Sequence, residues 1–182
     1  MDEIIKIDNA IRDHIETLKK EATKLEFNVI CEFSLNKEHI SEIPWRTLNY
    51  PGVYLIEIKN NNTFNTFSKW LEDFKPKWED ERYVKSYTPN LKKKRIRNHH
   101  ELEEWIPLYI GISKRIEGRV HEHIFKELHK TTFALKLNAR EFLFTERFRL
   151  KTINCPVDHY NIILPIIESK QREKINPLIG KQ

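Results

Sequence analysis

The chain has 182 residues and a formal net charge of +5 at pH 7, with 39% hydrophobic and 32% charged residues. This length suits one hydrophobic core, and the balance is typical of globular proteins that fold in water. No stretch reaches the ~20 apolar residues that cross a bilayer, and the N-terminus does not resemble a secretory signal. The two cysteines, Cys31 and Cys155, lie far apart and argue against a disulfide framework. We therefore expect a cytoplasmic protein with no membrane partner.

Residues 1–44 are assigned to an N-terminal segment, in which apolar side chains recur at steps of three and four over residues 3–25. These side chains are Ile4, Ile7, Ile11, Ile15, Leu18, Ala22 and Leu25. Such spacing predicts an amphipathic helix. We expect this helix to pack on the core, because a coiled-coil dimer would need more turns. Residues 29–35 are consistent with a short strand.

Residues 45–182 are predicted to form the main domain, which begins with two strands separated by a long insertion. Residues 52–58 are β-branched and aromatic, and residues 107–111 form a second short run that ends in glycine. Both runs predict strands. The insertion, at about residues 60–105, mixes aromatic and charged residues, and we expect it to contain at least one helix.

The second half of this domain continues with a helix, a strand and a final helix. Ser113 can cap a helix that runs to residue 129, and residues 148–153 alternate as a third strand does. The last helix is expected to start near Pro165 and to end before Pro177. The predicted fold class is therefore α+β. It has a small, mainly antiparallel, three-stranded sheet flanked by helices, with an N-terminal helix and an insertion between the first two core strands.

The insertion carries a run of positive charge. Five of the six positions from 92 to 97 are cations, namely Lys92, Lys93, Lys94, Arg95 and Arg97. Such a run is often found along a nucleic-acid phosphate backbone. A solvated loop would explain the same residues, so both interpretations stay open at this point.

Two tripeptides in the predicted strands are followed by polar residues at regular spacings. Residues 52–54 read Gly-Val-Tyr, and residues 109–111 read Tyr-Ile-Gly. Downstream, Arg119 lies eight residues after the last glycine, and His123 lies four residues after Arg119. Glu168 lies nine residues before Pro177. In this order and at these spacings they resemble the GIY-YIG family of endonucleases.

The resemblance covers residues 51–58 and 107–177, and the chain departs from the family pattern in two respects. The family usually joins its two signatures by a tight hairpin, whereas Tyr54 and Tyr109 are 55 positions apart here. A longer surface loop costs only ~0.6 kcal/mol per doubling, so the sheet can tolerate it. Many members also carry an asparagine three residues after the proline, where this chain has Gly180.

The resemblance implies a metal-dependent nuclease that hydrolyses phosphodiester bonds. Glu168 would hold one divalent cation, Mg²⁺ with Mn²⁺ as a substitute, because magnesium keeps most of its waters and needs only one or two carboxylates. Arg119 would bind phosphate oxygens with its planar fork, and Lys114 would contact the backbone. His123 would orient the phosphate or relay a proton. A structural alternative is a salt bridge between Glu168 and Arg119.

Tyr54 is our candidate for activating the attacking water, with Tyr109 as the alternative. A free phenol with a pKa near 10 is a poor base at neutral pH. We therefore expect Arg119 and the metal to favour the phenolate and to lower the pKa of Tyr54. Without the motif spacing, both tyrosines would be interpreted as ordinary packing residues of strands.

Within this family, the compact chain without accessory domains favours a restriction or defence-type endonuclease acting on double-stranded DNA. A homodimer on the DNA is left open. The alternatives are a homing or mobile-element nuclease, or a repair nuclease. A different class is a catalytically inactive module that only binds nucleic acid, and the presence of the tyrosines, arginine and glutamate together argues against it.

Overall fold

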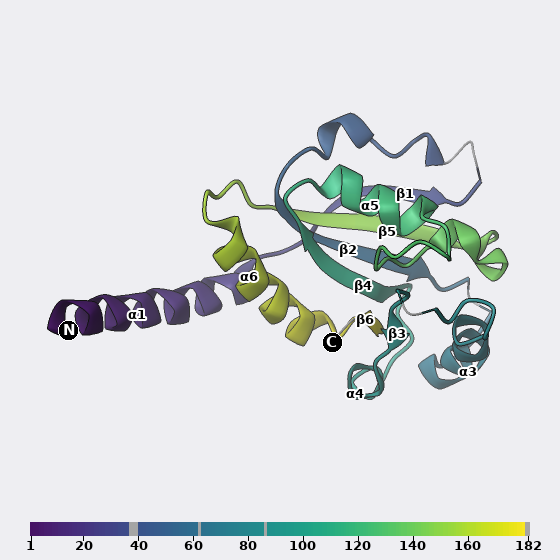
Figure 1. Cartoon of the computed structure of the whole chain (residues 1–182). Helices are drawn as coiled ribbons and strands as arrows, with labels where there is room; N and C mark the ends of the chain where they lie inside the picture. The colour runs from purple at the N-terminus through teal and green to yellow at the C-terminus, as the bar shows by residue number, and fades with distance from the viewer. Residues whose placement is uncertain (37–39, 62, 86, 181–182) are drawn as a thin grey trace.

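The computed structural model describes residues 1–36, 40–61, 63–85 and 87–180. Within these ranges the chain is an α+β protein with five helices, a four-stranded antiparallel sheet and a two-stranded sheet (Figure 1). In spatial order, the strands of the main sheet are β1 (Asn28–Ser34), β5 (Arg147–Asn154), β2 (Gly52–Lys59) and β4 (Trp105–Ser113). The small sheet pairs β3 (Asn90–Leu91) with β6 (Ile179–Gly180). No helix in the described part of the chain combines the length and apolar character needed to cross a membrane.

The main sheet has four strands, so the prediction of a three-stranded sheet is wrong. The additional strand is β1 from the N-terminal segment, which pairs antiparallel with β5 and places Phe33 opposite Phe148. The two rings are buried and stack with their centroids 5.5 Å apart. Burial of this cross-strand aromatic pair stabilises β1 as part of the core sheet.

Helices α5 (Ile116–Phe125) and α6 (Tyr160–Ile175) cover opposite faces of the main sheet. Alternate residues of a strand point to opposite faces. In the central strand β2, Tyr54 and Ile56 are buried in one apolar cluster with residues of α5. Val53, which precedes Tyr54 and points to the other face, is buried in a second cluster with residues of α6. Each face of the sheet therefore has its own helix and its own core.

Helix α1 (Asp2–Lys24) forms as predicted, but it packs on the body only near its C-terminal end. There the Gln171 amide of α6 donates a hydrogen bond to the Ala22 carbonyl at 2.7 Å. Ile4 and Ile7 are more than half exposed, and Figure 1 shows α1 projecting from the rest of the molecule. The expectation that the whole helix packs on the core is wrong for its N-terminal half, because α6 contacts only its last turns.

Helix α5 is shorter than predicted at both ends. It begins at Ile116 and ends at Phe125 rather than extending from Ser113 to residue 129. Ser113 does not cap it, because its hydroxyl accepts a hydrogen bond from the Arg115 N–H (3.0 Å) in the turn that precedes the helix.

Helix α6 begins five residues before the predicted start, at Tyr160, so that Pro165 lies inside the helix. A proline is best tolerated in the first turn and removes one backbone hydrogen bond further along. The predicted end before Pro177 is confirmed, since the last helical residue is Ile175 and Asn176 has a left-handed backbone with φ of 54°.

The predicted insertion lies between β2 and β4 and contains helices, as expected. Its longer helix is α3 (Phe67–Trp78), and its shorter one is α4 (Lys93–Ile96). The buried side chains of α3 are Phe67, Trp70, Phe74 and Trp78. Each ring stacks on the next, with centroids 4.7 to 6.0 Å apart. This aromatic ladder joins the α5-side core and anchors the first part of the insertion.

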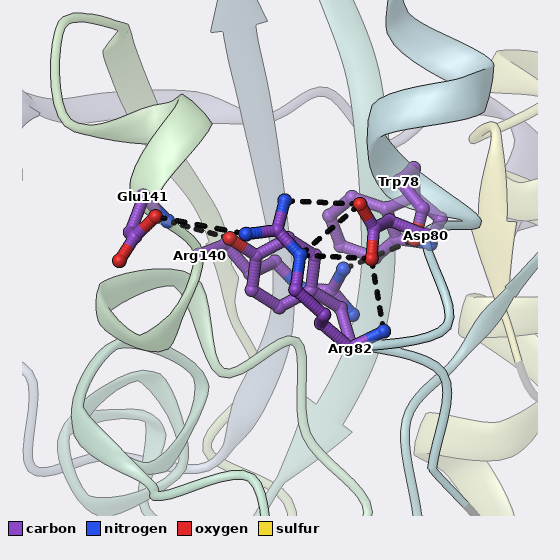
Figure 2. Close-up of polar contacts among 6 residues, drawn as sticks. Trp78, Asp80, Arg82, Arg140 and Glu141 are labelled. Atoms are coloured by element: carbon purple, nitrogen blue, oxygen red, sulfur yellow. Dashed lines mark hydrogen bonds and ion pairs between the residues drawn. The ribbon is translucent and has the colours of Figure 1, made fainter.

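Arg140 ties α3 to the segment that follows α5. Its guanidinium lies 3.8 Å from the centroid of the Trp78 ring. It donates through Nε to the Leu135 carbonyl at 3.1 Å and through Nη1 to the Trp78 carbonyl at 3.2 Å. Figure 2 shows this cluster beside the Asp80–Arg82 ion pair. Burial lowers the pKa of Arg140 to about 10 and Tyr83 opposes this shift, so the side chain is still charged at neutral pH.

We predict that Arg140→Met destabilises the protein by about 3 kcal/mol, because it leaves two buried carbonyls without a donor and removes a cation–π contact. Urea unfolding followed by circular dichroism measures this change. Arg82→Ala is the matched control, since Arg82 lies beside the same cluster but is largely exposed. If the two variants have the same urea midpoint, Arg140 does not hold the insertion in place.

Candidate active site

A cleft of about 410 Å³ opens where β4 forms the edge of the main sheet. Its polar lining consists of Tyr54, Tyr109, Arg119, Glu168, Arg95 and Arg172. The first four are predicted site residues that lie far apart in the sequence. They meet because α5 and α6 approach the same sheet edge from opposite faces. The described residues thus bring phenols, a carboxylate and guanidinium groups together in one concave site.

Tyr54 and Gly111 form a cross-strand pair between β2 and β4, so their side-chain positions lie on the same face of the sheet. A Cβ on Gly111 would collide with the Tyr54 hydroxyl and would lie 2.7 Å from the ring carbon that bears it. Only glycine leaves room for the phenol at this wall of the cleft. The last residue of the Tyr-Ile-Gly segment is therefore needed for space.

Tyr109 lies two residues before Gly111 on β4 and therefore on the same face of the sheet, and the strand pairing becomes irregular only beyond it. Ile56 lies opposite Tyr109 and Glu57 lies opposite Pro107, so Leu108 is a bulge residue without a partner in the register. The rings of Tyr54 and Tyr109 stack with centroids 6.2 Å apart. Tyr109 is 8% exposed and Tyr54 is fully buried, so both phenols line a largely dry wall.

His123 is fully buried behind Tyr54 and does not line the cleft. Its Nδ1 accepts a hydrogen bond from the Leu135 N–H at 3.0 Å, which places the ring proton on Nε2. The Nε2–H then donates to the Tyr54 hydroxyl oxygen at 2.8 Å. Burial and the nearby Arg119 lower the pKa of His123 well below its ordinary value of 6.5. The geometry does not support the expected phosphate contact or proton relay, and His123 instead positions Tyr54.

The pKa of Tyr54 shifts in the direction opposite to the prediction. Burial raises it well above the ordinary value of 10, the neighbouring Tyr109 raises it further, and Arg119 opposes the rise. Burial also raises the pKa of Tyr109, again against Arg119. The prediction of a lowered pKa is therefore wrong for the protein alone. Burial destabilises the phenolate by more than one nearby guanidinium stabilises it.

Arg119 projects from α5 and is held by two acceptors. Its Nη1 donates to a carboxylate oxygen of Glu122 at 2.6 Å, and its Nη2 donates to the Phe133 carbonyl at 2.5 Å. The side chain is 21% exposed. Because these bonds fix the plane of the guanidinium beside the two phenols, Arg119 has a defined orientation toward the cleft.

Glu168 is the acidic side chain of the described cleft lining, and it is 20% exposed. Its partner is Arg172, one turn later on α6, at 3.4 Å, so a salt bridge to Arg119 is not what compensates it. Burial raises the pKa of Glu168, while Arg172 and Arg95 oppose the rise. Arg172 was missed by the sequence interpretation, although the i, i+4 spacing of Glu168 and Arg172 on a helix indicates a pair.

The remaining predicted cations separate into two groups. Arg95 lines the cleft. Lys93, Lys94, Arg97 and Lys114 are exposed and Lys92 is half-buried, all outside the cleft lining. Lys114 lies over the ring of Tyr160, 5.1 Å from its centroid. The basic run is thus one cleft residue flanked by surface cations.

Comparison with known proteins adds nothing to this geometry. No family model matches the chain, and no curated protein or solved structure is significantly similar to it.

The burial of neutral His123 predicts a loss of stability in acid. Below pH 6.5 the unfolded chain binds a proton at this histidine and the folded chain does not. Stability should therefore fall with pH by up to about 1.4 kcal/mol per unit. His123→Gln keeps a donor near Nε2 but does not titrate. In urea titrations at pH 8, the free energy of unfolding of this variant should be lower than that of the wild type. This difference should be smaller at pH 5.

The control for this experiment is His14→Gln on the exposed part of α1, which should show no pH-dependent difference. If the difference in unfolding free energy between His123→Gln and the wild type stays constant from pH 8 to pH 5, His123 is not a buried neutral donor.

Proposed function

We propose that the protein is a magnesium-dependent endonuclease that hydrolyses phosphodiester bonds of double-stranded DNA. In this proposal its core is a GIY-YIG catalytic domain, and its role is that of a cytoplasmic restriction or defence-type enzyme. The observation that carries the proposal is the convergence of Tyr54, Tyr109, Arg119 and Glu168 on one cleft. The tripeptide motifs and their spacing predict these residues from the sequence, in which they span 115 positions.

The arrangement of core elements supports the family assignment. The two signature tripeptides lie on paired antiparallel strands, β2 and β4, and β5 adds to the other edge of β2. Arg119 follows on the next helix and Glu168 on the last one. The motif residues thus lie on strands and helices that can hold them rigidly, which suits a preorganised site.

Hydrolysis needs a base for the attacking water, and Tyr54 is the better placed phenol. In the reaction the water oxygen bonds to phosphorus, its proton passes to the phenolate, and the bond from phosphorus to the 3′ oxygen breaks. The departing oxygen takes a proton from solvent, and the Tyr54 phenol returns its proton to solvent. The products carry a 5′ phosphate and a 3′ hydroxyl. The His123 Nε2–H donates to the Tyr54 oxygen and Arg119 lies nearby, so two groups favour the charged form of this phenol. Tyr109 has no comparable histidine donor among the described contacts.

Arg119 would hold the phosphate while the geometry at phosphorus changes. Its planar guanidinium matches two phosphate oxygens, and Glu122 and the Phe133 carbonyl prevent its rotation. Because the cleft is partly shielded from water, this charge acts more strongly there than in solution. A fixed positive fork therefore stabilises the extra negative charge of the transition state.

The cleft fits a hydrated divalent cation rather than one enclosed by protein ligands. Glu168 provides one carboxylate, and no group of three or more His, Cys, Asp or Glu side chains lies together among the described residues. Mg²⁺ commonly binds through one carboxylate, substrate phosphate and its own waters. Held through Glu168, it would supply electrophilic stabilisation of the departing 3′ oxygen, with Mn²⁺ as a substitute. Metal affinity in this site should therefore depend on bound DNA.

The first test compares the wild type with Glu168→Gln on supercoiled plasmid, with and without magnesium. The wild type should cut only with magnesium, leaving ends that a kinase labels only after phosphatase treatment. Glu168→Gln should remain folded and bind DNA in a gel shift, but should not cut at any magnesium concentration, because the metal ligand is lost. Glu173→Gln is the matched control on the same helix, since Glu173 is exposed and outside the cleft lining.

Cleavage by Glu168→Gln at the wild-type rate would remove this residue from the mechanism. A wild type that binds DNA but cuts neither DNA nor RNA with magnesium or manganese would favour a nucleic-acid-binding module without activity.

The second test concerns the base. Tyr54→Phe should lower kcat by roughly 10²–10⁴-fold while the fold survives, as expected for loss of a general base. Wild-type kcat should also rise with pH through the neutral range, because a raised pKa leaves little phenolate at pH 7, and the variant should lose that rise. Tyr87→Phe, on an exposed tyrosine, is the control. If Tyr109→Phe abolishes cleavage and Tyr54→Phe does not, the roles of the two phenols are exchanged.

A further inference from the structure

The insertion is joined to the last residues of the described chain by backbone hydrogen bonds. Strand β3 of the insertion pairs with β6, with Asn90 opposite Gly180. The Lys92 N–H donates to the Leu178 carbonyl at 2.8 Å, and the Leu178 N–H donates to the Pro107 carbonyl of β4 at 2.9 Å. The C-terminal segment therefore lies between the edge strand of the main sheet and the insertion.

A second set of contacts holds the insertion on the other side of α4. The Asn98 amide donates to the Asn176 side-chain oxygen at 2.8 Å, and the His99 Nε2–H donates to the Asn176 carbonyl at 2.8 Å. The ring of His99 also stacks on Phe67 of α3, with centroids 4.9 Å apart. Helix α4 is consequently fixed at both ends against the segment that follows the helix carrying Glu168.

Arg95 is the α4 residue that enters the cleft. Its Nη1 contacts the Pro177 carbonyl at 3.5 Å and lies 2.7 Å from the position that a Cβ on Gly180 would take. The backbone of β6 thus passes directly beside the guanidinium, and the missing side chain at Gly180 gives Arg95 its space. Lys93 and Lys94, its neighbours on the same short helix, are exposed.

Guanidinium groups gather in the described lining of the cleft. Three guanidinium groups, from Arg95, Arg119 and Arg172, line it together with one carboxylate. Burial and the like charge of Arg172 lower the pKa of Arg95, while Glu168 opposes this. Planar guanidinium groups that line one cleft suit the oxygens of a phosphate group.

We propose that Arg95 is a phosphate-binding residue that the insertion supplies to the active-site cleft. Its fork would hold a phosphodiester oxygen on the Glu168 side, while Arg119 holds the phosphate from the α5 side. This proposal rests on the proposed nuclease function for the identity of the substrate, but not for the presence of a phosphate site. It gives the insertion a function within the site, distinct from the surface role of the neighbouring lysines.

The first test measures phosphate binding without any cleavage. Inorganic phosphate is titrated at constant ionic strength, and thermal unfolding and calorimetry report its binding to the wild type, Arg95→Ala, Arg95→Lys and Lys69→Ala. Lys69 is the control because it is an exposed cation of the insertion outside the cleft lining. The wild type and Lys69→Ala should be stabilised equally by phosphate, Arg95→Ala should bind at least tenfold more weakly, and Arg95→Lys should bind with intermediate affinity.

The second test measures DNA cleavage with the same variants. Arg95→Ala should lower kcat by roughly 10²-fold, as loss of one preorganised donor does. A lysine at this position should recover part of the loss, because it keeps the charge but not the fork. Lys69→Ala should cut at the wild-type rate.

A third variant tests the space that Gly180 provides. Gly180→Ala should displace the end of the Arg95 side chain, which is flexible, and should lower kcat nearly as far as Arg95→Ala does. In the double variant Gly180→Ala, Arg95→Ala the two losses should not multiply, because both remove the same contact. Losses that do multiply would show that Gly180 acts independently of Arg95.

The proposal is overturned if phosphate stabilises Arg95→Ala as much as the wild type, or stabilises neither. It is also overturned if Arg95→Ala cleaves with wild-type kcat, in which case the nuclease proposal survives alone. If the wild type cuts no nucleic acid but phosphate binding still depends on Arg95, the phosphate site stands and the nuclease function falls.

Discussion

The pairing of Tyr54 with Gly111 across β2 and β4 is the contact on which the rest of the site depends. It sets the phenol at the sheet edge, where the absence of a Cβ leaves the space that the ring occupies. From that position the hydroxyl meets the His123 Nε2–H on the inner side and lines the cleft on the outer side. A shift of β2 by one residue would turn its side chains to the opposite face, so that Tyr54 would no longer share a face with Gly111 and Arg119.

The edge position of β4 explains how residues from opposite faces of the sheet share one cleft. Helix α5 packs on the face that carries Tyr54, whereas α6 packs on the face that carries Val53. Side chains of the two helices could not meet across a central strand, because the sheet itself would separate them. Beside an edge strand, Arg119 and Glu168 approach the same space. Nearby, the N–H of Leu178, which precedes β6, donates to the Pro107 carbonyl of β4.

Much of this arrangement could be predicted from the sequence, because it follows from local periodicity and motif spacing. The strands that carry Tyr54 and Tyr109 and the helix that ends before Pro177 lie where the patterns place them. The partner of β1 could not be predicted, since strand pairing depends on contacts between distant residues such as Phe33 and Phe148. The direction of the Tyr54 pKa shift was also inaccessible, because it depends on burial, which no local pattern reports.

The place of Arg95 was the least predictable feature, and the anchoring of the insertion explains why. Its charge appears in a run of similar residues, and only the three-dimensional path of the chain separates it from Lys93 and Lys94. That path is fixed at one end by Arg140 and the aromatic ladder of α3, and at the other by β6 and Asn176. A flexible loop of this length could not hold one guanidinium in a defined place, because each residue left free would add conformational entropy. Anchoring on both sides of α4 removes that freedom, so a long insertion can supply a residue as precisely as a core helix does.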